Sequence, residues 1–178
     1  MIQILKNRLI KGIVSQPVEL KSLVKDNLAA VELESVGSEL QKLIRKKFGR
    51  SLHIREVDTG SCGACDSEII STTNPLYDVQ RFGVNFVASP RHADALMVTG
   101  PVSKNMLGAL KKTYGAMPEP KFVITVGDCA LAGGVFKDSY YTAGGVNAIL
   151  PVALHIPGCP PKPLEIITSL LTFLSCCK

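Results

Sequence analysis

The sequence lacks a stretch that could cross a membrane, and it is poor in aromatic residues. A membrane-spanning helix needs about 20 consecutive apolar residues, whereas the longest apolar run, residues 166–174, is shorter and carries hydroxyl side chains. Tryptophan is absent, and only 6% of the residues are aromatic. They do not alternate with basic residues as in proteins that bind single-stranded nucleic acid. We therefore expect neither a membrane span nor a nucleic-acid-binding protein.

The sequence also lacks a secretory signal, internal repeats and low-complexity segments. Lys6, Arg8 and Lys11 interrupt the first apolar residues, and no small-residue cleavage site follows them. We expect a cytoplasmic protein, whose thiols stay reduced unless they bind metal. The net charge of +5 lies largely in the first 50 residues. It suits a solvated basic face, and it also suits contact with an anionic membrane surface or an acidic partner.

Residues 1–50 are predicted to form a helical N-terminal extension, separate from a domain at residues 51–178. Apolar residues at positions 2, 5, 9 and 13 share one helical face, Pro17 interrupts the pattern, and a second helix is predicted over residues 36–48. Such helices pack on their own domain, dock on another subunit or lie on a membrane surface. The pattern does not choose among these three arrangements.

From residue 51 onward, strand-like and helix-like segments alternate. Strands are predicted at 52–57, 84–88, 95–99, 121–126 and 152–156, and helices at 66–73, 104–114 and 164–174. Continuous apolar runs indicate strands that are covered on both faces. Strands that alternate with helices pair in parallel through right-handed crossovers. The sequence therefore predicts an α/β domain with a flavodoxin-like, open, mainly parallel sheet and helices on both faces.

Four cysteines follow predicted strands, at the point where each strand ends. Cys62 and Cys65 follow the first strand, Cys129 the fourth and Cys159 the fifth. Because parallel strands bring their carboxyl ends to one edge of the sheet, where ligands bind, these four thiols are expected to meet. The amide groups and dipole of the helix predicted after the first pair favour thiolate over thiol.

The cysteine spacing alone leaves several chemistries open. Four thiolates suit a 4Fe–4S cluster. Structural zinc usually takes two closely spaced pairs of ligands, and this chain has one pair followed by two single cysteines. A thioredoxin-type redox pair at Cys62 and Cys65 leaves the other two unexplained, and inert thiols remain an alternative. Cys176 and Cys177 close the chain, and we expect them to be surface thiols because termini are poorly ordered.

The cysteines belong to a longer ordered set of motifs. These are Gly-Ser-Cys-x-x-Cys-Asp-x-Glu at 60–68, Ser-Pro-Arg-His-Ala-Asp at 89–94, Thr-Gly-Pro-Val at 99–102, Gly-Asp-Cys-Ala at 127–130, Gly-Gly-Val-Phe at 133–136 and Ile-Pro-Gly-Cys-Pro-Pro-Lys-Pro at 156–163. In order and spacing the set resembles the iron–sulfur subunit shared by respiratory complex I and nickel–iron hydrogenases. The resemblance covers roughly residues 51–174, and chance does not plausibly produce six such motifs in order.

The resemblance implies one 4Fe–4S cluster, with Cys62, Cys65, Cys129 and Cys159 as its ligands. It also implies an electron-transfer subunit with no independent catalysis, at the cytoplasmic side of the membrane. Its partners would be a large nickel–iron or nickel–iron-like subunit, a ferredoxin-type polyferredoxin subunit and membrane-arm subunits.

Two features sort the branches of this family. Complex I members usually carry adjacent cysteines in the first motif, whereas two residues separate Cys62 from Cys65. Soluble uptake hydrogenase small subunits continue into a long domain with further clusters, which this sequence does not show. The combination resembles the small subunit of membrane-bound energy-converting hydrogenases, of the formate hydrogenlyase kind. The alternative is a complex I-like subunit that passes electrons to a quinone or sulfur-compound site.

Several polar residues near the cysteines have both an ordinary and a functional interpretation. Asp66 and Glu68 cap and charge-complement a helix start, or Glu68 moves protons near the cluster. Arg91 and His92 are expected at the cysteine edge of the sheet, where they form a solvated loop end or contact the cluster or the large subunit. Lys162 has the same two interpretations, and we expect Tyr140 and Tyr141 to pack at an interface.

Overall fold

The structure is a computed structural model that describes residues 20–176, with side chains from residue 31 onward. The chain divides into two compact units, residues 1–34 and residues 35–178. The second unit holds every strand of the described residues and all the cysteines treated below. The fold described here is that of the second unit.

The centre of this unit is a five-stranded, wholly parallel sheet. Its strands are β1 (Leu52–Asp58), β2 (Val84–Phe86), β3 (Ala95–Thr99), β4 (Phe122–Val126) and β5 (Val152–Ile156). The spatial order is β2-β1-β3-β4-β5, which is the flavodoxin-like order. The sheet order and the parallel pairing confirm the predicted fold.

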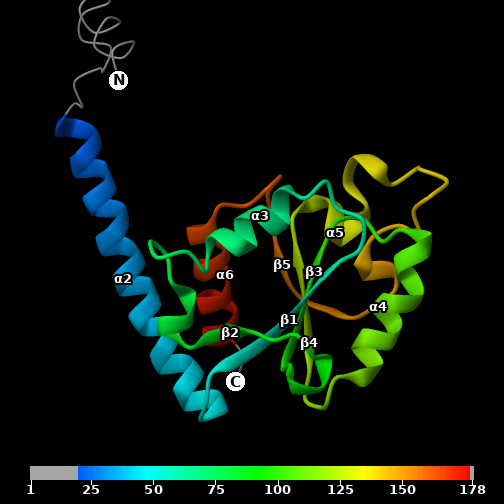
Figure 1. Cartoon of the computed structure of the whole chain (residues 1–178), viewed down its shortest axis with the longest axis horizontal. Coiled ribbons are helices and arrows are strands. Elements are labelled where there is room, and N and C mark those ends of the chain that lie inside the picture. The colour runs from blue at the N-terminus through cyan, green and yellow to red at the C-terminus, as the bar shows by residue number, and fades with distance from the viewer. Residues whose placement is uncertain (1–19, 177–178) are drawn as a thin grey trace, which may run out of the picture. The chain divides into compact units, whose positions relative to one another are not determined.

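Helices cover both faces of the sheet (Figure 1). On one face α4 (Lys104–Ala116) packs its buried Leu110 with Leu96, Val98 and Val123 of the strands. On the other face lie α3 (Ala64–Ser71) and α6 (Pro163–Cys176), which contact each other. Every residue of β3 is buried, because this central strand has a helix layer on each side.

The described chain begins with α2 (Leu20–Phe48), which contains the predicted helix at residues 36–48. From Ser35 onward α2 belongs to the second unit, where Leu40 and Ile44 are buried. The predicted helical face at positions 2–13 and the break at Pro17 lie outside the described residues. The domain boundary at residue 50 stays a prediction. Within residues 20–176, no helix combines the length and apolar character that crossing a bilayer requires.

Two elements differ from their predicted bounds in ways that affect the site. The strand predicted at 84–88 ends at Phe86, paired with Ile54 near the amino end of β1. The helix predicted from residue 66 begins at Ala64, because Gly63 adopts a left-handed conformation (φ 85°) at its N-cap position. A short helix, α5 (Asp128–Ala132), follows β4 and was not predicted.

Candidate functional site

Four cysteines from three loops line one cavity at the carboxyl edge of the sheet. Cys62 and Cys65 lie between β1 and the first turn of α3, Cys129 lies in α5, and Cys159 follows β5. Gly100 and Pro101, which follow the intervening strand β3, also line this cavity. Cys62 and Cys159 are exposed, whereas Cys65 and Cys129 are half-buried. The predicted convergence of the four side chains is therefore confirmed.

The loop that carries the first two cysteines is held by hydrogen bonds from its own backbone. The Oδ1 atom of Asp58 accepts from the amides of Gly60 (2.8 Å) and Ser61 (2.7 Å). The Ser61 hydroxyl oxygen accepts from the Gly63 amide at 3.0 Å. Hydrogen bonds to a carboxylate are stronger than those between neutral groups. Asp58 at the end of β1 therefore fixes the backbone immediately before Cys62.

Asp128 joins the loops of the other two cysteines. Its amide donates to the carbonyl oxygen of Gly158 at 3.0 Å, and its Oδ1 atom accepts from the Gly158 amide, also at 3.0 Å. Asp128 directly precedes Cys129, and Gly158 directly precedes Cys159. One residue thus bonds both polar backbone groups of the residue before the fourth cysteine.

Two glycines leave room for the sulfur atoms. A Cβ atom on Gly127 would lie 2.6 Å from Sγ of Cys65, and one on Gly134 would lie 2.7 Å from Sγ of Cys129. Both glycines have positive φ, 84° and 51° respectively, a region that glycine adopts without steric cost. The backbone therefore approaches the thiols more closely than any other residue type would permit.

The two half-buried thiols resist ionisation. Burial raises the pKa of Cys65 to about 11, and the nearby Cys62, Cys159 and Cys129 groups raise it further. Burial also raises the pKa of Cys129, against a hydrogen bond from the Val135 amide that lowers it. The expectation that the helix start favours thiolate is wrong for Cys65, because burial and neighbouring thiols outweigh the helix dipole. Metal binding at this site must therefore release protons.

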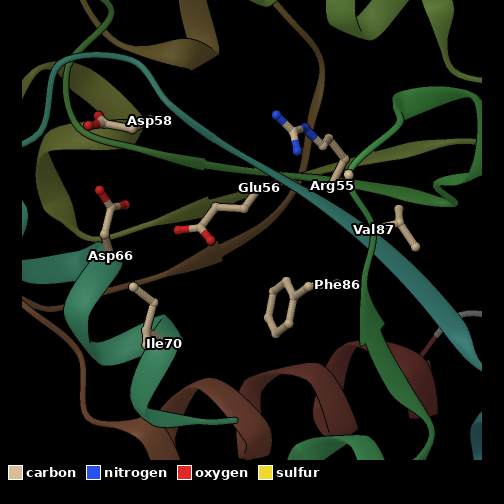
Figure 2. Close-up of a pocket in the computed structure, with 8 residues that line it drawn as sticks. Arg55, Glu56, Asp58, Asp66, Ile70, Phe86 and Val87 are labelled. Carbon is tan, nitrogen blue, oxygen red and sulfur yellow. The ribbon is translucent and has the colours of Figure 1, made fainter.

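A second cavity, of about 430 Å³, lies beside the first cysteine loop and is lined by acidic and apolar side chains. Figure 2 shows the carboxyl groups of Glu56 and Asp66 turned toward a common space, with Asp58 beside them and Phe86 on the opposite side. Burial raises the pKa of Glu56 to about 7, and a hydrogen bond to Asp66 and the charges of Asp66 and Asp58 add to the rise. Glu56 is therefore protonated in a large fraction of molecules near neutral pH.

Asp66 does not cap its helix, so the capping interpretation is wrong. Because α3 begins two residues earlier than predicted, Asp66 lies inside the first turn. Its carboxylate instead accepts from the hydroxyl of Thr99 at 2.7 Å and from that of Ser61 at 3.3 Å. Asp66 therefore links the first cysteine loop to the end of β3. Glu68 is half-buried on α3 and lines neither cavity.

Arg91 and His92 do not lie at the cysteine edge, and that expectation is wrong. They belong to a short 3-10 helix, η2 (Pro90–His92), that leads directly into the amino end of β3. The carbonyl oxygen of His92 lies 3.1 Å from Nδ1 of His53, at the start of β1. Because β2 ends opposite Ile54, the chain that follows it stays near the amino edge of the sheet.

The remaining predicted residues are all exposed. The Lys162 amide donates to Glu165 Oε2 at 2.9 Å at the start of α6. Tyr140 is 87% exposed and Tyr141 46% exposed, so both are accessible to a partner protein. Cys176 is exposed at the far end of α6, which confirms it as a surface thiol, and Cys177 lies outside the described residues.

Sequence reasoning missed Glu56, Asp58 and Asp128 at this site. Asp58 and Asp128 stand directly before glycine-containing cysteine loops, where an aspartate commonly accepts hydrogen bonds from the following amides. That signal was available for Asp58, which precedes Gly60 by two positions. Glu56 occupies an ordinary alternating position of a strand and carries no comparable signal. Among residues 20–176, no three His, Cys, Asp or Glu side chains are gathered closely enough to hold a single metal ion.

Comparisons with known proteins agree with this arrangement. The family model described as NADH ubiquinone oxidoreductase, 20 Kd subunit, matches residues 62–173. A probable membrane-bound hydrogenase subunit, mbhJ, of Pyrococcus furiosus is 48% identical over 122 residues, which are 68% of this chain and 73% of the relative. Formate hydrogenlyase subunit 7 of Escherichia coli is 44% identical over 130 residues, 73% of this chain, which spans about half (51%) of that relative.

A solved structure supports the same assignment at the level of the fold. A chain of the membrane-bound sulfane sulfur reductase, an archaeal respiratory membrane complex, superposes with a TM-score of 0.63 at 31% identity. The match covers 74% of this chain and 71% of that chain. The family includes subunits of hydrogenases and of NADH–quinone oxidoreductases, which makes it a family of oxidoreductase subunits. This chain belongs to the NADH ubiquinone oxidoreductase 20 kDa subunit family.

Proposed function

We propose that this chain is the electron-transfer small subunit of a membrane-bound energy-converting hydrogenase. It carries one 4Fe–4S cluster on Cys62, Cys65, Cys129 and Cys159. The observation that supports this proposal best is the shared cavity, which all four cysteines line although roughly 100 residues separate the first from the last. Four thiolates are the usual ligand set of such a cluster.

The surroundings of the cysteines fit the group. Gly127 and Gly134 keep side chains away from two of the sulfurs, so backbone amides can approach and hydrogen-bond sulfur. Cys62 and Cys159 lie at the surface, whereas Cys65 and Cys129 are partly buried. The site is thus open to a partner on one side and anchored in the sheet on the other.

When bound, the cluster supplies one-electron transfer without bond chemistry on this chain. The role of the protein is to hold the four thiolates, to exclude water from the buried side and to set the potential through hydrogen bonds and nearby charge. The chain would take electrons from a ferredoxin-type subunit and pass them to the nickel–iron site of a large subunit. Separate membrane-arm subunits would carry out ion pumping, so the chain would work at the cytoplasmic side of the membrane. Glu68, one turn into α3, would assist proton movement near the site.

The hydrogenase branch has the support of two relatives above 40% identity, the hydrogenase subunit of Pyrococcus furiosus and the formate hydrogenlyase subunit. The Cys-x-x-Cys spacing of the first motif also favours it. A complex I-like subunit, serving a quinone or sulfur-compound site, is the second candidate. The 31% identity to a chain of the sulfane sulfur reductase specifically favours its sulfur-linked form. The two candidates share fold and cluster and differ in the large subunit.

The cluster assignment is tested by replacing single cysteines. Cys129→Ala and Cys159→Ala are produced anaerobically, and iron content and the EPR spectrum of the reduced protein are recorded. We expect about four irons per wild-type chain and a lost or altered spectrum in each variant. Cys176→Ala, an exposed thiol at the far end of α6, is the matched control and should behave as wild type. A complete cluster with an unchanged spectrum in Cys159→Ala would remove Cys159 from the ligand set.

The choice between the two branches is tested on the partner. The large subunit that copurifies with a tagged chain is identified by mass spectrometry, and its sequence is inspected for two Cys-x-x-Cys pairs. A large subunit with both pairs and bound nickel supports the hydrogenase. A large subunit without them replaces it with the quinone- or sulfur-linked alternative.

A further inference from the structure

We infer that Asp128 is a positioning residue that couples the loops of the third and fourth cysteines and places a negative charge beside the proposed cluster. The inference rests on the proposed function, because it concerns how the chain holds and tunes that group. Asp128 acts through Cys129 and Cys159 and is not itself a ligand.

The coupling consists of a reciprocal pair of hydrogen bonds. Asp128 donates its amide to the Gly158 carbonyl and accepts the Gly158 amide on Oδ1, both at 3.0 Å. The bonded residues directly precede Cys129 and Cys159. These bonds extend the pairing of β4 with β5, which ends where Val126 lies opposite Ile156. They therefore carry the register of two strands into the two loops that end in thiols.

The fourth cysteine depends on this anchor more than the first two do. Cys62 and Cys65 are three positions apart in one turn, with hydrogen bonds from Asp58 and Ser61 to that turn's own backbone. Cys159 stands alone and is exposed. Its preceding glycine has a φ of 133°, a conformation that almost only glycine adopts. The bonds to Asp128 hold Gly158 in this conformation and so direct the chain at Cys159 toward the other thiols.

The side chain that makes this bond also carries charge. Burial raises the pKa of Cys129, and the carboxylate of Asp128 is among the charges that add to that rise. The same field opposes any added negative charge, including an electron on a cluster held by Cys129. Asp128 therefore lowers the reduction potential of the site. Asparagine at this position would keep an oxygen acceptor for the Gly158 amide and remove the charge.

This difference gives the experiment, which compares Asp128→Asn and Asp128→Ala with wild type in the full, anaerobically reconstituted chain. The control is Glu119→Gln, which removes an equal charge from an exposed residue before the amino end of β4. The readouts are the rate of iron loss to a chelator and the midpoint potential from an EPR-monitored redox titration.

In Asp128→Ala we expect iron loss at least about tenfold faster than in wild type, the factor expected for the lost hydrogen bond to a charged acceptor. In Asp128→Asn we expect iron loss within about threefold of wild type, since the acceptor remains, and a more positive potential. Glu119→Gln should match wild type in both readouts.

Three results would overturn the inference. Iron loss from Asp128→Ala at the wild-type rate would eliminate the coupling, and so would equally fast loss from the asparagine and alanine variants. An unshifted potential in Asp128→Asn would eliminate the charge effect, and this readout holds even if the alanine variant does not fold. A wild-type chain that binds no iron would instead overturn the proposed function, which keeps the two failures distinct.

Discussion

The carboxyl group of Glu56 is hydrogen-bonded to that of Asp66, beside the loop that carries Cys62 and Cys65 (Figure 2). Two carboxyl groups share a hydrogen bond only when one of them holds a proton. Asp66 already accepts from two hydroxyl groups, those of Thr99 and Ser61, which favours its ionised form. The proton therefore resides on Glu56, whose pKa is raised to about 7.

This raised pKa predicts a loss of stability as the pH rises. Glu56 binds its proton more tightly in the folded chain than in the unfolded chain, where the pKa is near the ordinary 4.5. The free energy of unfolding should therefore fall between about pH 4.5 and 7, and this contribution should level off above pH 7. Glu56→Gln, which is neutral throughout, should gain about 1–2 kcal/mol relative to wild type across this window, after allowance for solvent screening.

Guanidinium denaturation of both proteins at pH 5, 6, 7 and 8 measures this difference. Glu119→Gln, at a residue whose side chain is 74% exposed, controls for the exchange of glutamate for glutamine. A stability difference between wild type and Glu56→Gln that stays constant from pH 5 to 8 would contradict the raised pKa.

Asp58 should stabilise the first cysteine loop through its single oxygen Oδ1. Asp58→Ala removes the acceptor of the Gly60 and Ser61 amides and should lower the free energy of unfolding by about 1–2 kcal/mol. Asp58→Asn keeps one carbonyl oxygen, and both bonds go to one oxygen in the structure, so it should cost less than half as much. Equal losses in the two variants, measured by denaturant titration, would show that charge rather than geometry matters here.

Gly127→Ala should disrupt the site more than it disrupts the fold. The new methyl group would lie 2.6 Å from Sγ of Cys65, a distance that forces the thiol to move. We expect iron content to fall to less than half of the wild-type value. The matched control is Gly144→Ala, where φ is also positive, 96°, but a Cβ would meet nothing within 4 Å. Both variants carry a backbone strain of about 1–3 kcal/mol, so equal iron content in the two would refute a role for the close approach.

Glu68→Gln separates a proton-carrying role from a structural one. Glu68 is half-buried and lines neither cavity, so its replacement should leave the fold and the iron content intact. If Glu68 moves protons, turnover of the assembled complex should fall by about tenfold or more, in the range of general acid–base effects. Iron content and hydrogen-linked activity of the same preparation provide the test, and unaltered turnover rejects the proton role.

The sheet and the meeting of the cysteines were predictable because they depend on local patterns. The apolar run of β4 indicated a buried strand, and parallel strands place their following loops at one edge. The positions of Cys129 and Cys159 followed from that rule. The left-handed conformation of Gly63, which starts α3 two residues early, has no equally clear sequence signal.

What could not be predicted depends on contacts between distant residues. Asp66 accepts from Thr99, 33 positions away, and Asp128 bonds Gly158, 30 positions away. The error over Arg91 and His92 came from the length of β2, since its apolar pattern continues past Phe86 where the pairing stops. Glu56 looked like any polar residue on an alternating strand, and only the arrangement of α3 beside β1 shows its carboxyl neighbour.

The placement of thiols on the first and last strands bears on how the protein is made. During synthesis, Cys62 leaves the ribosome roughly 100 residues before Cys159, a delay of about 5–20 s at usual elongation rates. Throughout that delay three reduced sulfurs await a fourth, because β5 has not yet docked against β4. Loading of a centre that needs all four must therefore follow translation, and cells have to shield the nascent chain from oxidation until the last strand closes the sheet.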